Sequence, residues 1–228
     1  MINRQKFEIR NPALPAGKQE SGTTKVVIVA NGKFPEHEIP LKALTEADIV
    51  VCCDGATVKV DSFGTDPTAI VGDLDSLGDE LKAKYHDRLF HNHDQETNDL
   101  TKAIQWCLER EYVEVSILGA TGLRDDHTLG NISLITRYAK MGVNVRMITD
   151  SGYFIPVLQP AKIESFKGQQ VSIFSQDSTT LITTTNLKYP IIDRPLAELW
   201  MGTLNESLGD WFQLDFHPGP LIVFATFS

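Results

Sequence analysis

Residues 67–76 read PTAIVGDLDS and form the centre of the predicted fold. The apolar run Ala69–Val71 is typical of a buried strand that ends at the following glycine. Asp73 and Asp75 follow one residue apart, so in an extended backbone both carboxylates point to the same side. Because two like charges repel, such a pair favours a cation, and Mg²⁺ typically binds one or two carboxylates together with phosphate oxygens. The alternative interpretation is a polar turn in which Asp73 caps the next helix.

Strand and helix patterns alternate from residue 25 to about residue 150. In the predicted helix at 97–108, Thr97 or Asn98 is the expected N-cap, and Asp99 and Lys102 lie on the side away from the apolar stripe. This alternation predicts an α/β domain, a parallel sheet with helices on both faces. Strands are expected at 25–30, 48–53, 69–71, 88–91, 113–118 and 143–149, and helices at 41–47, 79–85, 97–108 and from the end of loop 120–127 to residue 142.

The pattern changes at about residue 152. Short runs rich in Ile, Val, Thr and Phe are separated by Gly, Pro, Asn and Asp, without a good amphipathic helix among them. This pattern predicts a smaller all-β sandwich. We therefore divide the chain into an N-terminal extension (1–24), an α/β domain (25–152) and a β-sandwich domain (153–228). The clearest strands of the sandwich are expected at 170–175, 179–184, 211–216 and 221–227.

Composition narrows the class of protein. The 228 residues carry a net charge of −9, which disfavours a nucleic-acid or anionic-membrane partner. Three cysteines cannot build a disulfide framework, and their spacing matches no zinc site, so reduced thiols are expected. Residues 1–24 lack the apolar run of a signal peptide, and no stretch reaches transmembrane length. We expect a soluble, cytoplasmic protein with no nucleic-acid and no membrane partner.

The candidate site lies where the predicted strands end and the helices begin, since ligands of open parallel sheets bind beyond the carboxyl ends of the strands. Carboxylates that hold Mg²⁺, with Lys and Arg to stabilise phosphate charge, are what phosphoryl transfer requires. The chain has no P-loop and no Gly-x-Gly-x-x-Gly motif. His91 and His93 lack the third histidine that a zinc site would need, and we interpret them as loop residues. The residues that we expect at this edge are Asn31, Asp54, Gly55, Asp73, Asp75, Asp99, Lys102, Arg124, Asp126 and His127.

Five motifs together resemble the thiamine pyrophosphokinase family, and they span most of the chain. They are CDGA at 53–56, IVGDLDS at 70–76, DQETNDLTK at 94–102, GATGLRDDH at 119–127 with GN at 130–131, and more weakly GTLNE at 202–206. The resemblance implies an α/β domain followed by a β domain. It also implies a homodimer whose active site lies between the α/β domain of one subunit and the β domain of the other.

The activity implied by this resemblance is Mg²⁺-dependent transfer of diphosphate from ATP to the thiamine hydroxyl, with release of AMP. By motif, Asp73, Asp75 and Asp99 would bind Mg²⁺, with Asp75 or Asp99 as a candidate base. The remaining assignments by motif are Asn31, Asp54 and Gly55 at the nucleotide, Lys102 and Arg124 at the phosphates, Gln95, Asp126 and His127 at the junction of nucleotide and thiamine, and Asn205 at the substrate.

The acceptor site departs from the family pattern at one position. Many relatives have Ser-Asn where this chain has Leu204 and Asn205, so one hydroxyl contact to thiamine is missing. A cationic thiazolium ring favours an aromatic face, and Trp200, Trp211 and Phe212 are the candidates.

Two other functions remain open. Asp73 and Asp75 could hold a metal against the diphosphate of a sugar nucleotide, as in a glycosyltransferase, although Lys102 and the loop Arg124–His127 concentrate positive charge for a triphosphate. A nucleotide-sensing module that binds ATP without turnover is the second alternative.

Overall fold

The computed structural model describes residues 7–9, 24–94 and 96–228. These residues form two compact units. Residues 24–150 make up the first, called here the α/β unit, and the strand Phe7–Ile9 with Ser151–Ser228 makes up the second, called the β unit. Among the described residues, no helix combines the length and apolar character needed to cross a membrane.

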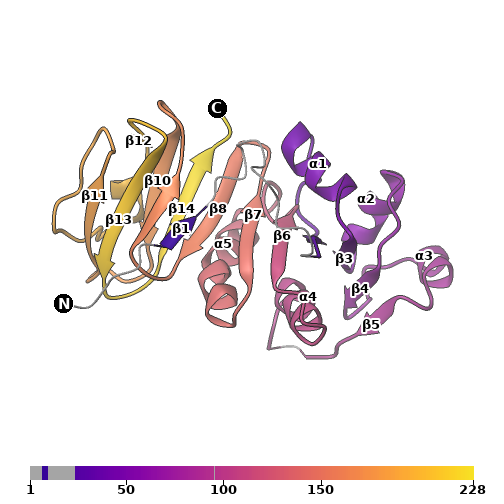
Figure 1. The fold of residues 1–228 in the computed structure, drawn as a ribbon. Coiled ribbons are helices and arrows are strands. Elements are labelled where there is room, and N and C mark those ends of the chain that lie inside the picture. The colour runs from indigo at the N-terminus through magenta and orange to yellow at the C-terminus, as the bar shows by residue number, and fades with distance from the viewer. Residues whose placement is uncertain (1–6, 10–23, 95) are drawn as a thin grey trace. The chain divides into compact units, whose positions relative to one another are not determined.

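The α/β unit is built on parallel strands in the order β7-β6-β2-β3-β4-β5 (Figure 1). The central strands β2, β3 and β4 are buried almost throughout, which means that both faces of the sheet are covered, as in other parallel sheets. The predicted α/β class is therefore confirmed. The strands are β2 (Val26–Val29), β3 (Ile49–Cys53), β4 (Ala69–Gly72), β5 (Leu89–His91), β6 (Glu114–Leu118) and β7 (Asn144–Ile148).

Helices connect these strands, and α4 (Asp99–Leu108) packs on β2, β3 and β4. Its N-cap is Asn98, whose Oδ1 accepts a hydrogen bond of 3.0 Å from the Thr101 N–H, in agreement with the sequence prediction. The helix α2 (Ala56–Ser62), which packs on β3, was not predicted. It is short and contains three β-branched residues, which lower helix propensity. The other helices are α1 (Glu38–Thr45), α3 (Asp79–Lys84) and α5 (Asp125–Lys140).

The start of α5 differs from the prediction. The helix begins at Asp125, so His127 belongs to its first turn and not to the preceding loop. Negative charge is favourable in the first turn of a helix, where Asp125 and Asp126 lie, and this favours the earlier start. Leu129, which the helical pattern placed on the apolar stripe, is exposed.

The strand order creates a topological switch point between β2 and β6. The chain leaves β2 toward β3 on one side, whereas it leaves β6 toward β7 on the other. The two departing loops are hydrogen-bonded to each other, through Gly32 N–H to Gly119 O at 2.6 Å and Lys33 N–H to Thr121 O at 2.8 Å. In open α/β sheets, the crevice at such a point is where ligands bind.

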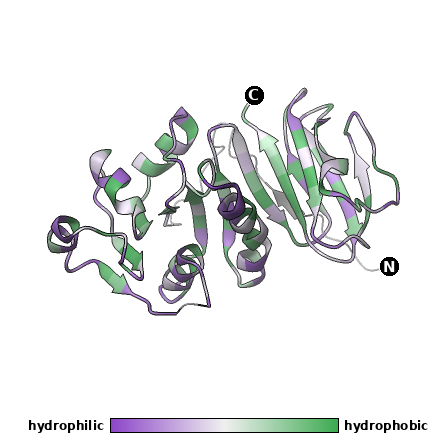
Figure 2. Cartoon of the chain, turned by 180° about the vertical axis from the view of Figure 1, so that it is seen from behind, coloured by the Kyte–Doolittle hydropathy of each residue, from purple (hydrophilic) through white to green (hydrophobic). Residues whose placement is uncertain are grey.

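The strands of the β unit are hydrogen-bonded in two groups, in the orders β12-β10-β14-β8 and β1-β9-β13-β11. Alternate residues of β13 (Phe212, Leu214 and Phe216) are buried in the core, and Figure 2 shows hydrophobic residues along the strands. The predicted sandwich is confirmed, although β1, β8, β9 and β12 were not predicted. Its elements are β1 (Phe7–Ile9), β8 (Gly152–Val157), β9 (Ala161–Glu164), β10 (Gln170–Ser175), β11 (Leu181–Thr185), β12 (Asn205–Glu206), β13 (Trp211–His217), β14 (Leu221–Thr226) and the 3₁₀ helix η1 (Leu199–Gly202).

Candidate active site

Asp54 follows β3 directly and is buried. Its Oδ2 accepts a hydrogen bond of 3.1 Å from the Ser76 N–H, whereas its Oδ1 is buried and has no hydrogen-bond partner. Burial raises the pKa of Asp54, and the neighbouring carboxylates of Asp73 and Asp99 raise this pKa further. Ionised carboxylates repel one another, so a proton or a cation at this point would be stabilising.

Asp73 lies one residue beyond β4 and is partly buried. Its Oδ1 accepts a hydrogen bond of 3.2 Å from the Asp75 N–H, and this bond, together with the Lys102 ammonium, lowers the pKa of Asp73. The backbone between the two aspartates is not extended, because Leu74 adopts a φ of 61°. The assumption of an extended backbone from Asp73 to Asp75 is therefore wrong. Asp75 is exposed.

The first turn of α4 carries Asp99 and Lys102 close to Asp54 and Asp73. The Lys102 Nζ lies 3.2 Å from Asp99 Oδ1, and the Lys102 side chain is only 3% exposed. A Cβ on Gly72 would lie 3.0 Å from the Asp54 Cβ and 3.3 Å from Asp99 Oδ1, so the end of β4 packs closely against both acids. Asp54, Asp73 and Asp99, called here the carboxylate cluster, thus meet beside one buried ammonium.

The carboxylate cluster fits a magnesium ion in its chemistry. Among the described residues, no group of three or more His, Cys, Asp or Glu side chains is arranged so that it could hold a metal ion. Mg²⁺ rarely needs one, since it binds one or two carboxylates and keeps water or phosphate oxygens as its other ligands. The buried, unpartnered Oδ1 of Asp54 and the like charges around it are what such a cation would relieve.

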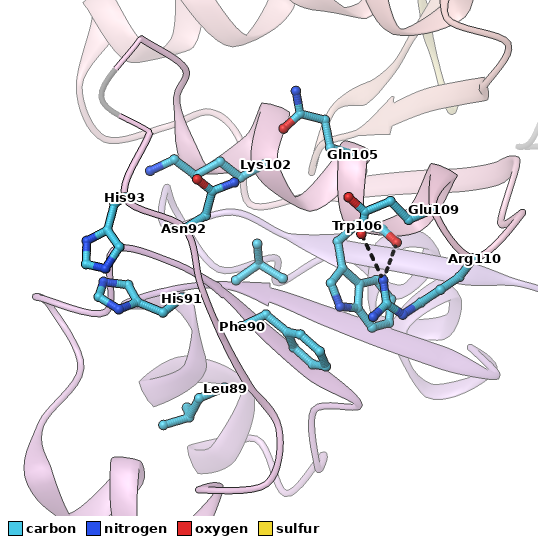
Figure 3. Close-up of a pocket in the computed structure, with 11 residues that line it drawn as sticks. Leu89, Phe90, His91, Asn92, His93, Lys102, Gln105, Trp106, Glu109 and Arg110 are labelled. Carbon is cyan, nitrogen blue, oxygen red and sulfur yellow. Dashed lines mark hydrogen bonds and ion pairs between the residues drawn. The ribbon is translucent and has the colours of Figure 1, made fainter.

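A cavity of about 470 Å³ lies between β5 and α4 (Figure 3). Lys102, whose Nζ is paired with Asp99, and Asn92 line one part of it. Trp106 lines another part, with the Arg110 guanidinium 4.0 Å from the centre of the indole ring. Sequence reasoning did not predict this cavity. Its walls come from the edge strand β5 and the helix α4, and no local sequence pattern shows that these two elements lie side by side. His91 and His93 also line the cavity, and the centroids of their rings lie 3.7 Å apart.

Arg124 and Asp126 form an exposed pair at the start of α5. The guanidinium donates from Nη2 to Asp126 Oδ2 at 2.6 Å and from Nε to Oδ1 at 3.1 Å, which holds the pKa of Asp126 at about 2. The His127 N–H also donates to Asp126 Oδ1, at 2.9 Å. Within the described residues, no hydrogen bond or ion pair joins Arg124, Asp126 or His127 to the carboxylate cluster, so their role at the nucleotide stays a prediction.

The other residues predicted at the substrate lie in the β unit and in the 94–102 motif. Asn205 is buried, and its side chain bonds to the backbone of Tyr189 and Glu206, so its role at the substrate stays a prediction. Phe212 is fully buried in the core, which excludes it as an aromatic face for a ligand, while Trp200 is 72% exposed. Gln95 lies outside the described residues.

Comparison with known proteins gives the family. Residues 41–147 match the family model of the thiamin pyrophosphokinase catalytic domain, and residues 152–224 match that of its substrate-binding domain. A thiamine pyrophosphokinase of Bacillus subtilis is 31% identical over 175 residues, which cover 72% of this chain and 80% of that protein. This chain belongs to the thiamine pyrophosphokinase family.

Other members of the thiamine pyrophosphokinase family agree with this assignment. Thiamin pyrophosphokinase 1 of Caenorhabditis elegans is 28% identical over 170 residues, 60% of this chain and 70% of that protein. The fold resembles the solved thiamin pyrophosphokinase from Candida albicans, with a TM-score of 0.80, 16% identity, and coverage of 98% of this chain and 93% of that one. The predicted family and enzyme class, an ATP-dependent diphosphotransferase, are thereby confirmed, and the glycosyltransferase and sensing-module alternatives find no support.

Proposed function

We propose that this chain transfers diphosphate from ATP to the hydroxyl of thiamine and releases AMP. The observation that carries the proposal is the carboxylate cluster beside the buried Lys102, inside the region that matches the family's catalytic domain. The transfer of a diphosphate group requires carboxylates that can hold Mg²⁺ and a lysine directed to the same phosphate oxygens.

The chain's own residues have two tasks in this proposal. Asp73 and Asp99, with Asp75, would hold Mg²⁺, which when bound supplies neutralising charge for phosphate oxygens. Lys102 lies 3.2 Å from Asp99, and it presents a further positive charge to the same oxygens. Catalysis then rests on holding the thiamine hydroxyl in line with the β-phosphorus, which gives binding and orientation the largest share of the rate. Arg124, Asp126, His127, Gly55 and Asn31 are proposed at the nucleotide, and Gln95 and Asn205 at the thiamine.

The products test the proposed transfer. With ATP, Mg²⁺ and thiamine, we expect AMP and thiamine diphosphate in equal amounts, because the hydroxyl attacks the β-phosphorus and AMP departs. Chromatography of the quenched reaction measures both products, and a reaction without thiamine is the control for ATP hydrolysis. Formation of ADP, or of thiamine monophosphate, would refute diphosphate transfer.

A homodimer is also proposed, in which the β unit of each copy takes part. The segment 189–204 carries an unusual group of exposed apolar side chains, and patches of this kind mark interaction surfaces. Burying them against a second copy would remove them from water. The members with the largest exposure are Ile192 at 71%, Trp200 at 72% and Leu204 at 74%.

Light scattering after gel filtration should therefore give twice the 25.4 kDa mass of the chain at micromolar concentration. Trp200→Glu places a charge within the exposed apolar group and should shift the mass toward that of the monomer. Leu158→Glu is the matched control, since Leu158 is exposed at 42% but lies outside the 189–204 segment. A monomeric mass for the unmodified chain would contradict the dimer.

The predicted cytoplasmic location stays a prediction.

A further inference from the structure

Lys59 lies in α2 and directs its ammonium group to the end of β2. Its Nζ donates to Gly32 O at 2.6 Å, to Asn31 Oδ1 at 3.0 Å and to Asn31 O at 3.4 Å. An ammonium group has three protons, so these three acceptors use all of them. Lys59 therefore ties the loop after β2 to α2 and has no donor left for a ligand.

The environment of Lys59 is unusual for a lysine on a short helix. Burial lowers the pKa of its ammonium, and no described carboxylate contributes to this pKa. Withdrawing an ammonium from water has a cost, which hydrogen bonds to the three neutral oxygens offset here. The interaction is thus not a surface ion pair. It holds in place the loop after β2, which supplies the acceptors.

The contact with Lys59 also fixes the orientation of the Asn31 carboxamide. Because Oδ1 accepts from Lys59, Nδ2 lies on the other side of the group, 2.5 Å from the place that a Cβ on Gly55 would occupy. Ser76, whose N–H donates to Asp54, approaches the same place, with its Cβ at 3.3 Å. The NH₂ group of Asn31 is therefore held against the segment that carries the buried acid of the carboxylate cluster.

The loop with Asn31 is also the loop at the topological switch point. Its neighbour Gly32 bonds to Gly119 in the loop after β6, where the chain leaves in the opposite direction. Ligands of open α/β sheets bind in this crevice. An amide NH₂ group can only donate hydrogen bonds, and an oxygen of a phosphate or a ribose in this crevice is a suitable acceptor for it.

We propose that Lys59 is a positioning residue, which holds the Asn31 carboxamide at the switch point so that its NH₂ group donates to an oxygen of the bound nucleotide. This inference rests on the proposed function, because the nucleotide is the ATP of that reaction. Lys59 itself does not touch the nucleotide.

Steady-state kinetics of Lys59→Met test the proposal. We expect the KM for ATP to rise about tenfold, because a released carboxamide loses a hydrogen bond to a charged oxygen, while kcat and the KM for thiamine change less than about twofold. Lys59→Arg should restore the KM for ATP to within about threefold of the original, since a guanidinium can donate to the same oxygens. Lys42→Met is the matched control, because that exposed lysine of α1 makes only a long ion pair of 3.8 Å, and we expect no change.

A double-mutant cycle shows whether Lys59 acts through Asn31. In an Asn31→Ala background, Lys59→Met should change the KM for ATP less than about twofold, because the group that it positions is already absent. A full effect of Lys59→Met in that background, or an equal change in the KM values of both substrates, would overturn the proposal. Failure of Lys59→Arg to restore the KM for ATP would overturn it as well.

Calorimetric binding of Mg–ATP separates this inference from the proposed function. If the unmodified chain binds ATP but forms no AMP with thiamine, the proposed function fails, and the dissociation constants of the Lys59 variants still decide the inference. If the unmodified chain binds no ATP, both fail. A Lys59→Met protein that does not fold leaves the decision to Lys59→Arg and Asn31→Ala, and an Asn31→Ala protein with unchanged ATP affinity would overturn the inference.

Discussion

Asp99→Asn is expected to lower kcat/KM about 10³-fold while the protein stays folded. Asparagine keeps the shape of the side chain but removes the charge that would hold Mg²⁺. Its Oδ1 can still accept the hydrogen bond from Lys102, which is 3.2 Å long in the unmodified chain. The buried ammonium also keeps the carboxylate of Asp73 as a counterion, so the substitution does not leave it as an uncompensated charge.

The rate of AMP formation at several Mg²⁺ concentrations measures this effect. A higher Mg²⁺ concentration should recover part of the lost rate, because the weakened affinity for the ion can be offset by mass action. Asp79→Asn is the matched control, since Asp79 is an exposed aspartate in the first turn of α3, as Asp99 is in the first turn of α4. A turnover within tenfold of the original in Asp99→Asn, or an equal loss in Asp79→Asn, would contradict the role given to the carboxylate cluster.

Much of the α/β unit could be predicted because its signals are local. Helix α4 has both an apolar stripe and an N-cap in sequence, and the strand β4 is a short apolar run that ends at Gly72. Parallel strands place their carboxyl ends at one edge, so the sequence alone leads one to expect Asp54, Asp73 and Asp99 there. The structure places these three acids close together.

The remaining features depend on contacts that no local pattern encodes. The strand β1 pairs with β9, more than 150 residues away along the chain, and its three residues show no strand periodicity of useful length. The left-handed backbone at Leu74 depends on the turn in which Asp73 accepts from the Asp75 N–H, which overrides the extended conformation assumed for the strand end. The hydrogen bond from Lys59 to Asn31 joins two segments 28 residues apart, and a lysine in a weak helical pattern does not predict it.

Gly72→Ala is expected to lower kcat/KM about 10²-fold and the free energy of unfolding by about 1–3 kcal/mol. The added Cβ would lie 3.0 Å from the Asp54 Cβ, closer than two carbon atoms pack without strain, and 3.3 Å from the Asp99 Oδ1 oxygen, which is also a tight contact. Asp54 cannot easily retreat, because its backbone joins β3 directly to α2 and its N–H is bonded to Val71 O at 3.1 Å. Relief must therefore come from the carboxylate cluster, whose atoms would have to move by a few tenths of an ångström, and catalysis that rests on the orientation of charged groups is sensitive to such a displacement.

Urea unfolding and the rate of AMP formation measure the two effects of Gly72→Ala separately. Gly78→Ala is the matched control, because a Cβ there would meet no atom within 4 Å, and its φ of −67° suits any residue. We expect that control to change stability by a few tenths of a kcal/mol only. If Gly72→Ala acts through the cluster, combining it with Asp99→Asn should lower the rate little further than Asp99→Asn alone, since residues that act as a unit are not additive. Equal activity of the Gly72→Ala and Gly78→Ala proteins would show that the close approach of the three acids at the end of β4 is not needed for catalysis.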